Sequence, residues 1–348
     1  MENKKSVIVV GGGISGLSCG VYLAQHGFDV TILERNANVG GLCTAWVREG
    51  QLVDGCIHWL TGTRKGHFCY DIWENIGAFE DCNLIPIESW VNFTYEGKVV
   101  RFLRDYKKAE QEWLAIAPED SKEIKKFFKM VEGFISVELP MNRPMNELSL
   151  NQYLNIGFSI LKHPSYLYTM NIHTDEYAAR FKNPAIRWAL EHAQPGPGNL
   201  FSMIFSYATI CSNDCAVPEG GSRAFAERIL KRFLSVGGKV KLCSDVKEII
   251  VENNAAKGVL LKNGTEYRAD YVVAALDTYF TLAKLLNNKY KLPLFYNRAK
   301  NYEDYPTPTS LLITYEVEDL GDVDSPNHFL IDPIEVAGKK IKYINIRS

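Results

Sequence analysis

The feature that most constrains this chain is a glycine-rich turn between a short apolar run and a helical pattern near the N-terminus. Residues 6–10 (SVIVV) form a β-branched run typical of a buried parallel strand. The run leads into Gly11-Gly12-Gly13-Ile14-Ser15-Gly16, a GxGxxG motif, and apolar residues continue at helical spacing over 17–24. Residues 29–34 (DVTILE) then form a second strand that ends in an acid. This order predicts a dinucleotide-binding βαβ unit.

The three motif glycines have separate expected roles. Gly11 permits the tight turn out of the strand, and Gly13 has no side chain, so the backbone can approach a pyrophosphate. Gly16 lets the helix pack closely on the strand. The motif alone does not separate FAD from NAD.

The helix start and the terminal acid complete the candidate site. The helix N-terminus, at Ile14 and Ser15, offers free N–H groups and a positive dipole end to phosphates. Glu34 is expected to accept a hydrogen bond from an adenosine ribose hydroxyl.

A longer signature follows Glu34. Arg35 comes next, and then Gly40-Gly41 and Leu42, in a register that resembles the FAD-binding amine oxidase and phytoene desaturase superfamily. The resemblance implies FAD as the cofactor and places the paired glycines beside its phosphates and ribityl chain. Two glycines physically allow such a close backbone approach. By the same resemblance, Arg35 and Leu42 join the cofactor-binding residues.

Residues 53–59 (VDGCIHW) resemble a family segment near the flavin. The match is imperfect, because the family's glycine falls at Cys56 and Gly55 precedes it. The resemblance implies that His58 faces the flavin or a substrate channel and that Trp59 contacts substrate. The alternative for His58 is a structural hydrogen-bonding role.

A second block, residues 218–277, resembles the family's second FAD segment. Ser222 occupies an N-cap position ahead of a helix with an apolar face. Strands are predicted at 239–243, 246–252, 257–261 and 270–275, with a turn at Asn263-Gly264. The resemblance implies that the backbone of Val246 contacts the adenine.

Together these blocks predict an α/β fold with two interleaved domains. A Rossmann-like FAD-binding domain, a parallel sheet with a β-meander insert, is expected from 1–85 and 215–280. An α+β substrate-binding domain with a mixed or antiparallel sheet is expected from 86–214 and 281–348. Within it, residues 91–103 predict a hairpin and 309–317 a returning strand.

Two helices in the expected substrate domain have two interpretations each. The helix over 119–137 has an apolar face opposite a lysine-rich face, which fits either a surface helix packing inward or a peripheral membrane contact. The uncharged helix over 200–211 is too short to span a bilayer. Its Met203, Phe205 and Tyr207 either line a substrate tunnel or fill a core.

The composition excludes several classes. The chain has 348 residues, a formal net charge of −2 and eight scattered cysteines. The charge argues against nucleic-acid binding, and the cysteine spacing indicates reduced thiols rather than disulfides or a metal site. We therefore expect a cytoplasmic protein, with peripheral membrane contact as an alternative; the oligomeric state stays open.

The resemblance implies an FAD-dependent oxidoreductase of the phytoene desaturase type, acting on carbon–carbon bonds of an apolar isoprenoid or polyene substrate. A non-redox carotenoid cis–trans isomerase, an amine oxidase and a non-catalytic flavoprotein remain alternatives. Family members end with a third, glycine-containing FAD segment, and no counterpart is visible before residue 348. The expectation is a fragment or a lineage that lost this segment, with a less firmly held flavin.

Overall fold

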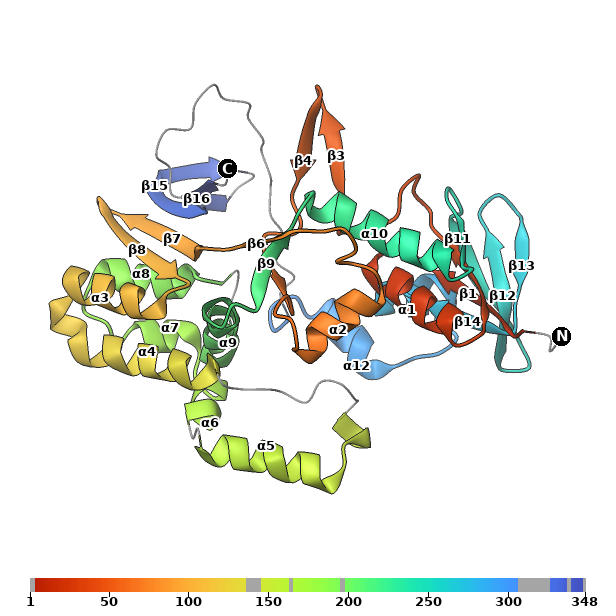
Figure 1. The fold of residues 1–348 in the computed structure, drawn as a ribbon. Coiled ribbons are helices and arrows are strands. Elements are labelled where there is room, and N and C mark those ends of the chain that lie inside the picture. Colours follow the sequence, from red (N-terminus) through yellow and green to blue (C-terminus); the bar gives the residue numbers. More distant parts are fainter. Residues whose placement is uncertain are drawn as a thin grey trace. The chain divides into compact units, whose positions relative to one another are not determined.

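The computed structural model describes residues 4–135, 145–162, 165–194, 198–305, 326–336 and 339–346. The chain divides into two compact units, drawn in Figure 1. Unit 1 comprises residues 1–58, 70–85 and 217–312, and unit 2 comprises residues 59–69, 86–216 and 313–348.

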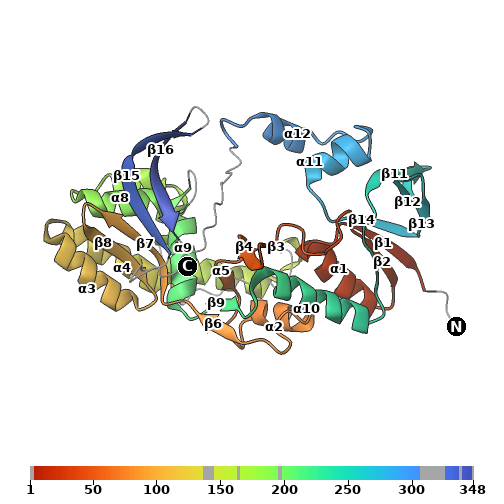
Figure 2. The same ribbon diagram turned by 90° about the horizontal axis from the view of Figure 1, so that it is seen from above.

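The centre of unit 1 is a four-stranded parallel sheet in the order β10-β2-β1-β14. Its strands are β1 (Ser6–Val10), β2 (Asp29–Leu33), β10 (Lys239–Lys241) and β14 (Tyr271–Ala274). The β-branched residues of β1 are almost fully buried, as expected for a strand covered on both faces. Helices α1 (Ile14–Gln25) and α10 (Gly221–Ser235) pack side by side (Figures 1 and 2). The predicted Rossmann-like sheet is confirmed.

Antiparallel strands surround this sheet in unit 1. The meander β11 (Val246–Glu252), β12 (Ala255–Leu261) and β13 (Glu266–Arg268) is the predicted insert, and β3 (Ala45–Arg48) pairs with β4 (Gln51–Asp54) as a hairpin. The remaining elements that lie in unit 1 or reach into it are α2 (Phe68–Asn75), β6 (Leu84–Pro86), α11 (Thr278–Phe280), the π-helix η3 (Thr281–Leu285) and α12 (Pro293–Lys300).

Unit 2 contains a mixed sheet in the order β16-β15-β7-β8. The predicted hairpin is β7 (Ser89–Tyr95) and β8 (Lys98–Leu103), and its turn residues Glu96 and Gly97 both have positive φ. Strands β15 (Asn327–Val336) and β16 (Lys339–Ile346) complete the sheet, with β15 parallel to β7. Helical and remaining elements are α3 (Tyr106–Ile116), η1 (Pro118–Asp120), α4 (Ser121–Ile135), η2 (Met145–Glu147), α5 (Leu150–Lys162), α6 (Ser165–Met170), α7 (Thr174–Ala178), α8 (Pro184–His192), α9 (Leu200–Cys211), β5 (Leu60–Thr61) and β9 (Cys215–Pro218).

Helix α4 packs its apolar face into the core of unit 2. Ile124, Phe127 and Val131 are fully buried there, and Phe127 stacks on Trp113 with ring centroids 5.3 Å apart. The apolar face of α4 is used within the protein, which favours the interpretation of a surface helix that packs inward. Residues 136 and 137 of the predicted helix lie outside the described residues. No helix in the described part of the chain has the length and apolarity to cross a membrane.

The compact units differ from the expected domain boundaries at three places, residues 59–69, 215–216 and 281–312. Residues 59–69 belong to unit 2, where Leu60 and Thr61 pair with Ala216 and Cys215. Residues 281–312 belong to unit 1, because Leu285 packs in the cluster that contains β11. The strand predicted at 309–317 lies outside the described residues.

Candidate cofactor site

The turn that ends β1 depends on two glycines for reasons internal to the protein. Gly11 has φ of +103°, and a Cβ atom there would lie 2.8 Å from the carbonyl oxygen of Ala275. A Cβ atom on Gly16 would lie 1.9 Å from the carbonyl oxygen of Gly11. Backbone conformation and packing therefore explain both glycines without any ligand.

Gly13 behaves differently. Its φ of −71° suits any residue, and the nearest atom to a Cβ built there is the Cα of Gly41, at 3.8 Å. Neither backbone strain nor a steric clash therefore requires glycine at this position. The residue lies at the N-cap of α1, where a missing side chain leaves the helix end open to a ligand.

The Gly40-Gly41 loop lies against the same turn. The N–H of Gly40 donates to the carbonyl oxygen of Gly12 over 2.8 Å, and Gly40 forms a parallel bridge with Gly13. Gly41 has φ of +61°, and a Cβ there would lie 3.1 Å from the Cα of Gly13. Two glycine loops thus meet backbone to backbone at the start of α1, which forms a cradle free of side chains.

Glu34 follows β2 beside this cradle and is almost fully buried. Its Oε2 accepts a hydrogen bond from the N–H of Gly12 and its Oε1 accepts one from the N–H of Asn36, both over 2.8 Å. The main chain of Glu34 is itself anchored to Lys241 and Ser244. A carboxylate oxygen has more than one lone pair, so these contacts orient Glu34 and leave acceptor capacity for a hydroxyl.

The start of α1 favours an anion. The first N–H groups of a helix, here at Ile14 and Ser15, have no partner within the helix. Gly13 supplies no side-chain cap and the first turn contains no acidic residue. The helix dipole therefore presents unneutralised positive character to the cradle.

The other predicted cofactor residues are more scattered. Arg35 and His58 are exposed, and Leu42 is 95% exposed. Val246 is buried in a cluster with Val10 and Leu33, the last residues of β1 and β2. The position of Val246 at the end of the parallel sheet is compatible with the predicted backbone contact, and the role of His58 stays a prediction.

The predicted substrate residues lie in unit 2. Met203 and Tyr207 are fully buried, and the Tyr207 hydroxyl donates to the carbonyl oxygen of Leu103 over 2.7 Å. Burial raises the pKa of Tyr207 well above its usual value. Phe205 and Trp59 pack against the same core and are only partly buried. This arrangement favours a core role for Met203 and Tyr207.

One structural contact was missed by the sequence reasoning. Asp54 accepts hydrogen bonds from the N–H of Ser222 over 2.5 Å and from its hydroxyl over 2.6 Å. The N-cap of α10 is Gly220, in the left-handed region, so Ser222 is not the cap that we predicted. The acid in the 53–59 segment was the available signal, because carboxylates favour helix N-termini.

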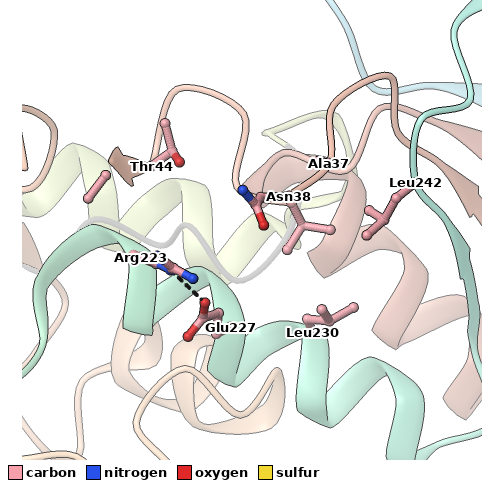
Figure 3. A pocket seen from close by; sticks show the side chains of 9 residues that line it. Ala37, Asn38, Thr44, Arg223, Glu227, Leu230 and Leu242 are labelled. Carbon is pink, nitrogen blue, oxygen red and sulfur yellow. Dashed lines mark hydrogen bonds and ion pairs between the residues drawn. The ribbon is translucent and has the colours of Figure 1, made fainter. Parts of the chain in front are cut away.

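A small pocket of about 90 Å³ lies between the 37–45 loop and α10 (Figure 3). Arg223 and Glu227 of α10 form an ion pair over 2.8 Å at its edge. Asn38 and Thr44 line it from the loop. Neither Glu34 nor the glycines of the cradle line this pocket, so it is separate from the candidate cofactor site.

Comparison with known sequences links this geometry to flavoproteins. A family model described as flavin containing amine oxidoreductase matches residues 14–333. The chain is 24% identical to a lycopene-forming phytoene desaturase of Pseudescherichia vulneris over 319 residues, covering 89% of this chain and 63% of that protein. It is 27% identical to a phytoene desaturase of Fusarium fujikuroi over 303 residues, covering 81% and 51%.

A third relative carries a different name. The chain is 25% identical over 352 residues to a chloroplastic prolycopene isomerase of Daucus carota, covering 93% of this chain and 54% of that protein. The chain thus spans between 51% and 63% of the length of these three relatives.

Solved structures agree on the fold. An oxidoreductase from Methanosarcina mazei matches with a TM-score of 0.53 at 16% identity, and a protein from Pyrococcus furiosus with 0.52 at 15%. Each match covers 85% of this chain and 65% of the other. At this identity, the structural likeness establishes the α/β architecture, and function has to be inferred from the residues of the site.

Proposed function

Because this chain belongs to the family of flavin-containing amine oxidoreductases, we propose that it is an FAD-dependent oxidoreductase that acts on carbon–carbon bonds of an apolar polyene. FAD is the cofactor. The proposal concerns where the chain holds FAD, which substrate class it takes and which reaction it performs.

The main observation in support of this cofactor site is that position 13 is glycine although neither its backbone conformation nor its packing requires one. Its conformation and surroundings would accept a side chain, yet any side chain there would project into the cradle between Gly13 and Gly41. A glycine that the fold does not require is explained by a ligand that needs the space. The pyrophosphate of a dinucleotide fits this requirement in charge and in position.

The residues of the cradle have distinct proposed roles. The N–H groups of Ile14 and Ser15 donate to the pyrophosphate, and the Gly40-Gly41 backbone limits its position from the other side. Glu34, oriented by Gly12 and Asn36, accepts a hydrogen bond from a ribose hydroxyl. FAD, when bound, supplies the hydride chemistry, so the protein itself needs only to bind, orient and exclude water.

The substrate class is supported by the names of the relatives. The two matched desaturases are named for phytoene, and the matched isomerase is named for prolycopene. All three relatives lie below 30% identity and are covered only in part, so the substrate is proposed as a class. Arg35, Leu42, His58 and Val246 stay proposed cofactor contacts, and Trp59 and Phe205 stay proposed substrate contacts.

Anaerobic turnover tests the proposal. The 348-residue chain is loaded with FAD and mixed with phytoene in detergent, while flavin absorbance is followed and the product is analysed by mass spectrometry. Bleaching of the flavin together with loss of two hydrogens from the polyene is expected. Glu34→Ala, with its weakened cofactor site, serves as the matched control and should turn over less at limiting FAD.

The match to prolycopene isomerase supports a second candidate, a cis–trans isomerisation without net redox change. Incubation with a cis-polyene distinguishes the two, because isomerisation changes chromatographic retention at an unchanged mass. Hydrogen peroxide released with amines, and no reaction with polyenes, would instead identify an amine oxidase. Retained FAD without turnover of either substrate class would contradict the proposed activity.

A further inference from the structure

Two cysteines lie at the base of the β3–β4 hairpin, one beyond the end of each strand. The antiparallel register pairs Trp46 with Val53 and ends at the pair of Ala45 with Asp54. Cys43 precedes Ala45 by two residues and Cys56 follows Asp54 by two residues, so the chain leaves the paired strands toward both cysteines.

Contacts with Ser222 of α10 bring the two cysteine segments together. The Cys43 thiol donates to the carbonyl oxygen of Ser222 over 3.6 Å, and the N–H of Ile57, the neighbour of Cys56, donates to the Ser222 hydroxyl over 2.9 Å. Burial, followed by the neighbouring Cys56, raises the pKa of Cys43 to about 12. Cys43 is buried and Cys56 is partly accessible, and all eight cysteines, which lie within the described residues, are free thiols.

Cys43 is also connected to the glycine loop of the candidate cofactor site. Its N–H donates to the carbonyl oxygen of Gly40 over 3.0 Å, and its own carbonyl oxygen lies 2.4 Å from a Cβ built on Gly40. The next two residues, Thr44 and Ala45, line the small pocket in front of α10 (Figure 3). A shift of Cys43 toward Cys56 would therefore move Gly40.

We propose that Cys43 and Cys56 are a redox-sensitive dithiol that closes to an intramolecular disulfide by exchange with a low-molecular-weight disulfide. The accessible Cys56 attacks first as its thiolate, forms a mixed disulfide and releases one small thiol. Cys43 then attacks the Cys56 sulfur and releases the second small thiol. The two protons of the cysteines end on the two released thiols, so the exchange balances in atoms and electrons.

The slow step follows from the environment of Cys43. Because burial disfavours its thiolate, closure of the mixed disulfide should accelerate as pH rises. The resulting disulfide joins the two ends of the β3–β4 hairpin. It also restricts the conformation of residues 40–43, which lead into β3.

Peptide mapping of the native chain tests the dithiol. The purified chain is incubated with glutathione disulfide, blocked with an alkylating agent and digested with trypsin, which cuts after Arg35, Arg48 and Arg64. Cys43 then lies in peptide 36–48 and Cys56 in peptide 49–64, so the disulfide is read directly as a linked pair that reductant separates. Cys56→Ser should abolish the linked pair, whereas Cys82→Ser should leave it unchanged.

The outcomes separate the proposal from its alternatives. A linked 36–48/49–64 pair that dominates in the native chain, and becomes one of many pairings after unfolding in guanidinium, supports the dithiol. A stable glutathione adduct on Cys56 with Cys43 still free would overturn it.

The regulatory consequence rests on the proposed function. Because closure displaces Gly40, the oxidised chain should bind FAD at least about threefold more weakly than the reduced chain. Equal FAD affinity of the two forms, with the linked peptide present, would overturn this consequence alone. Absence of FAD binding in both forms would count against the proposed function and leave the dithiol unaffected.

Discussion

The main-chain N–H of Gly12 donates to Oε2 of Glu34 over 2.8 Å, which joins the glycine turn after β1 to the acid after β2. The hydrogen bond thus holds Gly12 of the glycine turn beside Glu34, the proposed acceptor for a ribose hydroxyl. The second oxygen of Glu34 is held by the N–H of Asn36. Such preorganisation lowers the conformational cost of binding.

Glu34→Ala should weaken FAD binding by about 1–3 kcal/mol, the typical contribution of a hydrogen bond to a charged group. The substitution also leaves the N–H groups of Gly12 and Asn36 without their acceptor, so some loss of stability is expected. Glu34→Gln keeps the side-chain shape and one acceptor oxygen, so its FAD affinity should fall between those of the wild type and Glu34→Ala. Fluorescence titration with FAD measures the effect, with Glu74→Ala on α2 as a control. Equal FAD affinity of the wild type and all variants would show that Glu34 does not contribute to FAD binding.

Tyr207→Phe distinguishes a core residue from a substrate contact. The substitution removes the hydrogen bond to the buried carbonyl oxygen of Leu103, which should cost about 1–3 kcal/mol of unfolding free energy. Tyr302→Phe, at a side chain that is 69% exposed, should cost almost nothing. Denaturant unfolding measures both. A large rise in KM for a polyene, without loss of stability, would instead place Tyr207 in a substrate tunnel.

The free energy of unfolding should depend on pH partly through the carboxyl group of Asp270, which is hydrogen-bonded to Ser6 of β1. Hydrogen bonds from the N–H and hydroxyl of Ser6 lower the pKa of Asp270, with a smaller effect from Lys5 and Lys257. Because the folded-state pKa is depressed, the stabilisation is fully present above the unfolded value of about 3.9. It is lost as pH falls through the folded-state pKa.

Asp270→Asn provides the matched comparison. Unfolding of both proteins in urea from pH 7 to pH 3 should show a stability difference that shrinks as the wild-type carboxyl protonates. A difference that stays constant across this range would show that Asp270 does not contribute through its charge.

The parallel core of unit 1 was predictable because its pattern is local. Residues 6–34 contain strand, turn, helix, strand and acid in one continuous stretch, so no long-range pairing was needed to recognise them. The meander was equally readable, except that the turn between β11 and β12 is formed by Asn253 and Asn254, both in the left-handed region. Both residues tolerate that conformation, which makes a tight turn possible there.

The parts that were missed depend on contacts between distant segments. Asp54 and Ser222 are far apart in sequence, so the hydrogen bonds that Asp54 accepts at the start of α10 could not be assigned from the residues around the helix. The assignment of 281–312 to unit 1 depends on the burial of Leu285 against β11. A basic amphipathic helix such as α4 has the same sequence pattern at a membrane surface and on a protein core, and the packing of Phe127 in the core of unit 2 favours the second.

The central claim, that the open space at Gly13 holds the pyrophosphate of FAD, is tested most directly by Gly13→Ala. The structure has room for the new methyl group, so Gly13→Ala should lose at most about 1 kcal/mol of stability without cofactor, because glycine is preferred over alanine at an N-cap. Gly157→Ala inside α5, where a Cβ meets no neighbour, should gain roughly 0.5–1 kcal/mol through helix propensity and serves as the control for FAD affinity. FAD titration of the three proteins is the decisive measurement. The account predicts at least a tenfold loss of affinity, about 1.4 kcal/mol, for Gly13→Ala and wild-type affinity for Gly157→Ala. Wild-type FAD affinity in a stable Gly13→Ala protein would contradict it.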